Sequence, residues 1–572
     1  RNIDQPIELP ADEYTQLNYG GIVYSKTAVV FNYLLNYLGV ELFDQCMQTY
    51  YDRWKFKHPN PDDLQAVFEE VTGKDLHWFF HDLIETTKKI DYKISGIKKG
   101  DDLWGDVTLK VKQKGGVNGP FSVSNIREGV VDQTFWFDSI PDNKRITVPM
   151  PEGTEAFRID PQMIIPEVNR SNNTIRTTGP LKKAEPFRLQ FLAGIENPER
   201  SQAYWLPLIS GNAYDGFLLG FGLHNFQIPT RRVEWGIFPM YGFRSEGLRG
   251  SALLRAHLIR EPNKVLRHAD LNLDLKGFGI DTWEDDDLMR NQRFIKSSVG
   301  INFTFNTQLA SPHTHRLMIK SSVVQELFNW DGVPLLTNQE DPWTFTDAHY
   351  QYSNTHPILP FSVKGSYRLG VQNQVVGNDN ILSALEFRGN LRYRYDRKGH
   401  SILLRLFAGH YLYNNTNNGR FNYQLDGPGA WLDRFSSDFR YEYFYLGRNE
   451  TAPNFMGQQV LREHGGFLTN TRYSSDQTMI AANLTAQLPI PIGIAGFYNV
   501  AFIPGTSGID PWFHEAGVKL SLIRNFVELY LPLWSSQQLQ DETSLNDLPY
   551  LTRIRFTLNI HSAQLNNLVP FL

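Results

Sequence analysis

The chain has 572 residues, a net charge of −5 and a single cysteine, Cys46. These values leave room for several domains, exclude an internal disulfide framework and give no basic surface of the kind that binds nucleic acid. Mean hydropathy is −0.37, and no uncharged apolar run reaches the roughly 18 residues that a membrane-spanning helix needs. A membrane β-barrel is not excluded, because its strands are apolar on one face only, and the 13% aromatic content fits such a barrel.

Residues 1–88 follow helical periodicity. From Ile22 to Leu38 apolar residues recur at intervals of three and four, and Gly39 stands where a helix would end. Further helices are predicted over about residues 41–54, 64–71 and 75–84. Four short helices hardly make an independent domain, so this segment is predicted to be a helical piece of a larger one.

The same segment resembles a known enzyme family. The stretches VYSKTAVVFNYLLNYLG and FDQCMQTYYDRWKFKHPNPDDLQAVFEEVTGKDLHWFF resemble the gluzincin aminopeptidases (aminopeptidase N type), in which a Tyr-x-Lys-Gly helix follows the zinc site. The family's tyrosine falls on Tyr24, and Thr27 stands where the family usually has Gly. In that family the phenol donates a hydrogen bond to the oxyanion that forms when zinc-bound water attacks a peptide carbonyl. The resemblance therefore implies that Tyr24 is catalytic.

The zinc ligands of that family do not occur in this chain. Its HExxH motif, the following Glu ligand and the Glu that binds the substrate amine should precede Tyr24, and none is present. His77 and His81 in HWFFH have helical spacing, but Trp78 occupies the place of the catalytic Glu, so we interpret the pair as polar residues on the rim of an aromatic helix. The chain starts at Arg1 without a signal sequence, which favours a processed or truncated polypeptide. We expect zinc, and with it the peptide substrate, to be bound by an upstream peptidase part.

Residues 89–170 change to short alternating segments separated by Gly, Pro and Asp turns. About six or seven such strands predict an immunoglobulin-like β-sandwich without its disulfide. Asp160 could bind a cation, but it precedes Pro161 and is interpreted as a turn residue. Residues 171–186 are polar and are predicted to be a linker.

Residues 187–572 alternate apolar and polar side chains, as in His268–Lys276, Ser298–Asn306 and Arg553–Ile560. A period of two indicates strands with one apolar and one polar face. More than about ten such strands in a row predict a closed antiparallel β-barrel. A β-propeller is the alternative, although no blade motif recurs at a fixed period.

The composition of the two strand faces indicates which side of the barrel contacts water. The polar faces carry Arg, Asp, Asn, Gln and Lys, which are too charged to pack a dry core. An apolar outside and a polar lumen predict a transmembrane barrel of about sixteen strands in an outer membrane. Longer polar stretches are predicted to be surface loops that alternate with tight periplasmic turns. They are Thr282–Arg293, Asn329–Thr355 and Asn414–Trp431.

A second resemblance lies within the barrel region. AYDGFLLGFGLHN, FPMYGFRSEGLRGSA, FYLGRNETAPNFMGQQVLREHGGF and AANLTAQLPI resemble the bacterial surface antigen family, the barrels of outer-membrane assembly factors. That family has an LGG-type motif, here Leu446–Arg448, and an Arg-Gly-Phe/Tyr loop folded into the lumen, here Leu461–Phe467 with three residues inserted after the arginine. The resemblance implies that Arg462 is a lumenal residue that contacts an acidic strand residue. A Gly-rich turn with a solvated arginine is the alternative.

Two functions follow from these observations. In the first, the chain is the C-terminal portion of an outer-membrane-anchored zinc aminopeptidase of a Gram-negative bacterium, with residues 1–186 in the periplasm and the barrel as its anchor in lipid. In the second, it is a non-catalytic barrel subunit of an assembly or secretion complex, whose vestigial peptidase module docks other subunits. A substrate channel is a third interpretation, and it requires an open lumen.

Overall fold

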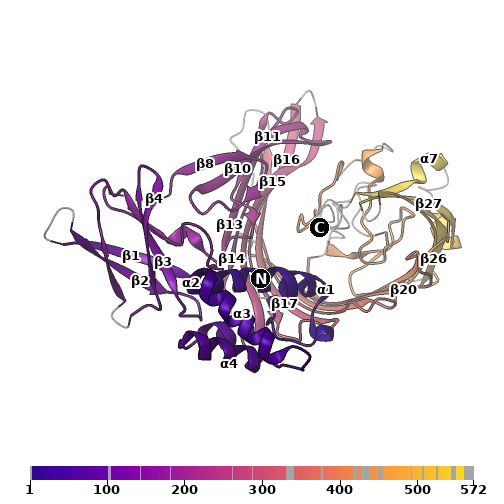
Figure 1. Ribbon diagram of the computed structural model, residues 1–572. Helices are drawn as coiled ribbons and strands as arrows, with labels where there is room; N and C mark the ends of the chain where they lie inside the picture. Colours follow the sequence, from indigo (N-terminus) through magenta and orange to yellow (C-terminus); the bar gives the residue numbers. More distant parts are fainter. Residues whose placement is uncertain are drawn as a thin grey trace. The chain divides into compact units, whose positions relative to one another are not determined.

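The computed structural model (Figure 1) describes residues 3–100, 105–141, 144–180, 182–183, 185–259, 262–285, 288–329, 341–374, 378–416, 421–426, 438–448, 455–490, 493–505, 508–523, 526–542 and 549–558. They fall into two compact units. The N-terminal unit comprises Arg1–Gln190, Ile195–Ala203 and Gln308–Ala310, and the barrel unit comprises Phe191–Gly194, Tyr204–Thr307 and Ser311–Leu572. A search of the described residues for a helix long and apolar enough to cross a membrane found none.

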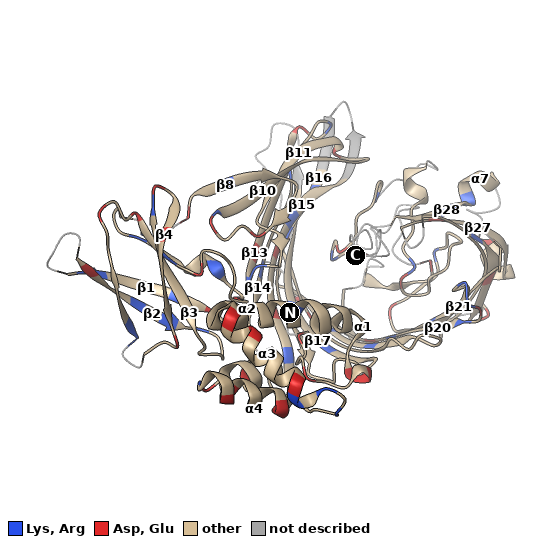
Figure 2. Cartoon of the chain, viewed as in Figure 1, with Lys and Arg blue, Asp and Glu red and all other residues tan. Residues whose placement is uncertain are grey.

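The N-terminal unit begins with helices. They are η1 (Ala11–Glu13), α1 (Gln16–Asn18), η2 (Tyr19–Lys26), α2 (Thr27–Leu38), α3 (Val40–Trp54), α4 (Pro61–Thr72) and η3 (Trp78–Ile84). The predicted end of the first helix at Gly39 is confirmed, because α2 ends at Leu38. Gly39 has φ +84°, a value that residues with a Cβ seldom adopt. Asn60 and Asp63 form a capping box at the start of α4. The acidic residues of α3 and α4 stand out in Figure 2.

Seven strands follow the helices and form two small sheets, as the alternation predicts. The strands are β1 (Tyr92–Lys99), β2 (Asp106–Gln113), β3 (Phe121–Arg127), β4 (Val130–Phe137), β5 (Arg145–Pro149), β6 (Ala156–Ile159) and β7 (Thr174–Arg176). One sheet has the order β1-β2-β5 and the other β4-β3-β6-β7. Asp160 is a buried turn residue: its carboxylate accepts hydrogen bonds from the Ile164 and Ile165 amides and pairs with Arg170 at 2.7 Å.

The helices and the sandwich share one hydrophobic core. The Tyr33 hydroxyl of α2 donates to the Pro120 carbonyl, and the Tyr92 hydroxyl of β1 donates to the Gly119 carbonyl at 2.7 Å. A Cβ on Gly119 would lie 2.7 Å from the Trp78 ring, so the backbone between the two layers leaves no room for a side chain there. The helices therefore bury their apolar faces on the sheets and do not form a separate core.

The large sheet is a closed barrel of seventeen strands among the described residues, in the order β10-β11-β13-β14-β15-β16-β17-β18-β19-β20-β21-β24-β25-β26-β27-β28-β8. Their bounds are β8 (Phe187–Phe191), β10 (Ser201–Asn212), β11 (Gly216–His224), β13 (Val233–Gly242), β14 (Gly247–His257), β15 (Leu266–Asp285), β16 (Leu288–Phe305), β17 (His313–Asn329), β18 (Trp343–Asn354), β19 (Phe361–Gln372), β20 (Asn380–Arg394), β21 (Ser401–Asn414), β24 (Thr478–Gln487), β25 (Ile494–Phe502), β26 (Trp512–Ile523), β27 (Val527–Ser535) and β28 (Arg555–Leu558). The predicted barrel is thus confirmed. The estimate of sixteen assumed a uniform strand length, whereas these strands range from 4 to 20 residues.

Two of the predicted loops are wrong in part. Residues 282–293 mostly extend the β15–β16 hairpin, where Asp285 faces Leu288 across the ladder. Residues 343–354 form β18. Polar composition misled the prediction, because a strand ladder needs only backbone hydrogen bonds and continues past an apolar band. Parts of the predicted loops, 330–340, 417–420 and 427–431, lie outside the described residues.

Strand alternation sorts the side chains as expected. On β20, Leu385 and Phe387 are exposed on the outer face, while Glu386 between them is buried inside. The same pattern places Ile319 and Val323 outside and Ser322 inside on β17. The barrel therefore has an apolar exterior and an interior that holds charge.

Candidate functional site

Tyr24 lies on η2, a π-helical segment that leads directly into α2. Its side chain is 66% exposed, whereas Ile22 on the same segment is buried. The Thr27 amide reaches back to the Ile22 carbonyl, the wide turn of a π-helix, and such turns occur often at functional sites. The ring of Tyr19 contacts that of Tyr24 edge-on, with centroids 6.3 Å apart. The helix thus presents the phenol to solvent, with Ile22 as the buried residue of the segment.

Residues near the start of the chain brace this helix. The ammonium of Lys26, the lysine of the Tyr-x-Lys sequence, lies 3.1 Å from the Asp4 carboxylate and 3.2 Å from the Gln5 carbonyl. The Gln5 side chain accepts from Asn18 at 3.0 Å. Lys26 therefore fixes η2 to the preceding segment, which accounts for a lysine two residues after the tyrosine.

Several apolar side chains of the segment around Tyr24 are exposed. They are Ile3, Leu17, Tyr19, Tyr24 and Val29. Of these, Tyr19 and Tyr24 contact each other.

The residues present do not fit the zinc site of the gluzincin family. His77, His81 and Asp82 are close enough to share a metal ion, but their side chains are already engaged: His81 Nδ1 lies 2.7 Å from Glu85, and Asp82 pairs with Lys88. The rings of His77 and His81 stack with centroids 4.5 Å apart. With no HExxH motif in the sequence, this chain offers Tyr24 and no ligand set of that family.

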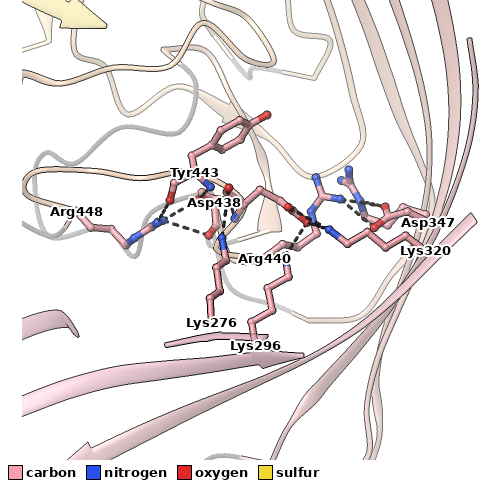
Figure 3. Close-up of polar contacts among 10 residues, drawn as sticks. Lys276, Lys296, Lys320, Asp347, Asp438, Arg440, Tyr443 and Arg448 are labelled. Carbon is pink, nitrogen blue, oxygen red and sulfur yellow. Dashed lines mark hydrogen bonds and ion pairs between the residues drawn. The ribbon is translucent and has the colours of Figure 1, made fainter. Parts of the chain in front are cut away.

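A second candidate site lies inside the barrel, where residues 438–448 are held against the strand wall (Figure 3). Lys276 and Lys296 face each other directly across β15 and β16, an arrangement of like charges that destabilises a sheet. Glu442 relieves it: its carboxylate lies 2.6 Å from Lys296 Nζ and 3.0 Å from Lys320 Nζ, and its carbonyl accepts from Lys276 at 3.4 Å. The Lys296 ammonium also donates to the Arg440 carbonyl at 2.6 Å.

Arg440 and Arg448 complete the attachment of this segment. Arg440 Nη1 lies 3.0 Å from both carboxylate oxygens of Asp347 on β18. Arg448 Nη1 lies 2.9 Å from Asp438, and its Nη2 donates to the Tyr443 carbonyl at 2.8 Å. The predicted motif arginine, Arg448, thus folds the segment back on itself, while Arg440 ties it to the wall.

The ion pairs continue along the strand wall toward the Leu461–Phe467 loop. Asp347 pairs with Arg368 at 3.0 Å, and Arg368 pairs with Glu386 at 2.8 Å. Arg388 lies 3.0 Å from Glu386 and also pairs with Glu463. A series of ion pairs therefore connects β18, β19 and β20 to Glu463.

Arg462 also points into the barrel. Its Nη2 donates to Asn499 Oδ1 at 2.7 Å and its Nη1 to Thr485 at 3.3 Å, and its guanidinium lies over the Tyr530 ring. Asn499 in turn donates to Glu515 at 2.5 Å. The arginine thus contacts buried strand residues, with the acidic Glu515 one hydrogen bond further on.

The interior is not polar throughout. A hydrophobic cluster joins the strands to the segments inside the barrel. Phe345 and Phe407 of the strands belong to it, together with Phe439 and Tyr441 of residues 438–448 and Phe467 of the Leu461–Phe467 loop. The Tyr441 ring stacks on Phe294 with centroids 4.1 Å apart. Around residues 438–448 the described part of the lumen is therefore filled by packed side chains, a layer that the alternation pattern did not predict.

Sequence reasoning missed the residues that anchor the inner segment. Lys296 and Glu442 are far apart in the sequence and lie in stretches with no motif. A lysine on the predicted inner face was a signal of buried charge, but its partner could be found only once the strands were paired.

The family comparison concerns the N-terminal unit. The Peptidase family M1 domain matches residues 1–83. Aminopeptidase M1-D of Oryza sativa subsp. japonica is 33% identical over 102 residues, which is 17% of this chain and 11% of that protein. Aminopeptidase N of Streptomyces lividans is 36% identical over 70 residues, 12% of this chain and 8% of that protein. The chain thus spans roughly a tenth of the curated relatives it matches.

Among solved structures, CdiB from Acinetobacter baumannii has a TM-score of 0.31 and 11% identity, with 60% of each chain covered. BamA from Haemophilus ducreyi lacking POTRA domains 1-3 has a TM-score of 0.32 and 11% identity, and the match covers 59% of this chain and 69% of that one. The protein joins a segment related to the M1 peptidases to a large β-barrel.

Proposed function

We propose that this chain is the C-terminal portion of an outer-membrane-anchored zinc aminopeptidase, in which Tyr24 completes an active site whose zinc ligands lie upstream. The observation that carries the proposal is the M1 match over residues 1–83. This segment contains Tyr24, the exposed tyrosine to which the resemblance assigns the family's catalytic role. The phenol donates a hydrogen bond to the oxyanion that develops on the peptide carbonyl, a contact that is stronger in the transition state than in the ground state.

The exposed apolar side chains near Tyr24 support the presence of a further peptidase part. A catalytic domain that packs on Leu17, Tyr19 and Val29 would bury these side chains and bring its own residues to the phenol. The brace between Lys26 and Asp4 would keep η2 in place as that interface forms.

The barrel serves as the anchor in this proposal. Its outer face carries apolar residues and its inner face charged ones, which is the arrangement that suits a lipid bilayer. In a Gram-negative outer membrane the peptidase part would lie in the periplasm. The packed inner segment supports an anchor over a peptide channel, because the segment is held by ion pairs and an apolar layer.

Tyr24→Phe in the full-length protein tests this function. We expect kcat on an aminoacyl-p-nitroanilide to fall by about a hundredfold or more, with KM and zinc content unchanged, because only the oxyanion donor is lost. Tyr19→Phe is the matched control, since Tyr19 is the exposed tyrosine in contact with Tyr24, and it should keep its rate. Full activity of the Tyr24→Phe enzyme would refute the role of this residue.

The alternative is a non-catalytic barrel subunit whose peptidase-like module docks partner subunits through the same exposed apolar side chains. The sequence upstream of Arg1 separates the two. An upstream segment without HExxH and the following Glu would rule out the enzyme and favour docking.

A further inference from the structure

Two histidines and two carboxylates meet on the inner face of the barrel, at the end where β14 stops and β15 begins. His257 is the last residue of β14 and pairs across the ladder with Asp270 of β15. The ring nitrogen Nδ1 of His257 contacts Asp270 Oδ1, and His268 Nε2 lies 2.8 Å from Asp270 Oδ2. Glu234 on β13 approaches the other side of His257, with Oε2 3.5 Å from Nε2.

These side chains are enclosed but poorly satisfied. The side chains of His257 and His268 are only 11% and 12% exposed. Both ring nitrogens of His268, and Nε2 of His257, are buried without a hydrogen-bond partner among the described residues. Each Nε2 does lie near a carboxylate, at 2.8 Å for His268 and Asp270 and 3.5 Å for His257 and Glu234. Nδ1 of His268 has no such contact among the described residues. Unpaired polar atoms at such depth cost free energy unless a ligand satisfies them.

The charge of the cluster also favours a cation. Asp270 and Glu234 provide two carboxylates, and the guanidinium of Arg255 lies at 3.9 Å from Glu234 and offsets one of them. Arg255 is itself directed to Asn272, to which its Nε donates at 3.0 Å. The carboxylate of Asp270, between two imidazoles, has no arginine or lysine in an ion pair with it among the described residues.

We propose that His257, His268 and Asp270 bind a divalent transition metal ion, with Zn²⁺ the best match to two imidazoles and a carboxylate. The candidate ligand atoms lie within 4.8 Å of one another, so small side-chain rotations would bring them to coordinating distance. In this proposal His257 binds the ion through Nδ1. A small movement of the ring closes the 3.5 Å gap between its Nε2 and Glu234 Oε2, so that Glu234 accepts a hydrogen bond in the carboxylate–histidine–metal arrangement that orients metal-binding imidazoles. The ion joins β14 to β15 and, through Glu234, to β13. This site is independent of the proposed peptidase activity.

The experiment uses the 572-residue chain in detergent micelles, stripped with EDTA and then incubated with ZnCl₂. We expect one equivalent of Zn²⁺ to stay bound after gel filtration, and Co²⁺ in its place to give the visible absorption of a low-coordinate site. His268→Ala and Asp270→Asn should each weaken Zn²⁺ binding at least tenfold. Heat-modifiable migration on SDS gels verifies that each variant keeps its barrel.

His77→Ala/His81→Ala is the control, because this pair belongs to the only other group of described residues with suitable spacing. It should retain the bound zinc. The proposal is overturned if the wild-type chain holds no Zn²⁺, which would mean that Asp270 merely bridges two imidazoles. It is equally overturned if the His77/His81 variant loses the ion while the folded His268→Ala protein keeps it.

Discussion

Glu442→Gln is expected to destabilise the barrel. Glu442 lies between the Lys296 and Lys320 ammonium groups, and the Lys296 side chain is only 2% exposed. Removing the carboxylate charge leaves Lys296 facing Lys276 across the strands without a neutralising anion. Loss of one partner of a buried ion pair typically costs about 3–5 kcal/mol, because the remaining charge stays desolvated.

The free energy of unfolding measured by urea titration in detergent micelles, with barrel loss followed by heat-modifiable migration, gives the magnitude. Lys296→Met should lower the free energy of unfolding less, because it removes the charged group and with it the cost of keeping that charge out of water. Adding Lys296→Met to Glu442→Gln should recover part of the lost stability. Asp510→Asn, at an exposed residue before β26, is the control and should leave the transition unchanged, because an asparagine side chain still accepts the hydrogen bond from the Trp512 amide. A loss below about 1 kcal/mol for Glu442→Gln would refute the reasoning, because water would then be screening the lysines.

Three further outcomes are expected. Burial raises the pKa of Glu167 from 4.5 to about 8, although hydrogen bonds from Asn173 and the Tyr92 amide oppose the shift. Between these two pH values the folded state binds a proton that the unfolded state has lost, so the contribution of Glu167 to the stability of the N-terminal unit should be largest below pH 4.5 and be lost as pH rises through 8. Glu167→Gln should abolish this pH dependence in melting curves. Gly119→Ala should destabilise the same unit by about 1–3 kcal/mol in thermal melts, because the added methyl group would lie 2.7 Å from the Trp78 ring. Gly96→Ala is the control, because the atom nearest to its methyl group would be Lys110 Cβ at 3.8 Å. The 572-residue chain should give no steady porin-like conductance in planar bilayers, because the inner segment is packed against the wall, and a large steady conductance would contradict that packing.

Local patterns were enough to predict much of the architecture. The period of two predicted a barrel with an apolar outside, and a helical stripe ending at Gly39 predicted α2. Both signals depend on neighbours a few residues apart, which the sequence displays directly. Tyr24 was found by its resemblance to a family motif, and its catalytic role stays a prediction that the Phe variant tests.

Partners far apart in the chain could not be predicted in this way. Lys296 and Glu442, 146 residues apart, meet only because the strands pair in one register and the inner segment folds back between them. The shared core of the helices and the sandwich has the same origin, since Tyr33 reaches Pro120 across 87 residues.

Local patterns in the sequence predict the type of each segment: helices with a peptidase motif, a small sandwich and a long series of amphipathic strands. The closure of the barrel by seventeen described strands, the apolar layer inside it and the meeting of His257, His268 and Asp270 at one end depend on contacts between distant residues. Alternation sets the face on which a side chain lies, whereas strand register sets which side chains on that face become neighbours.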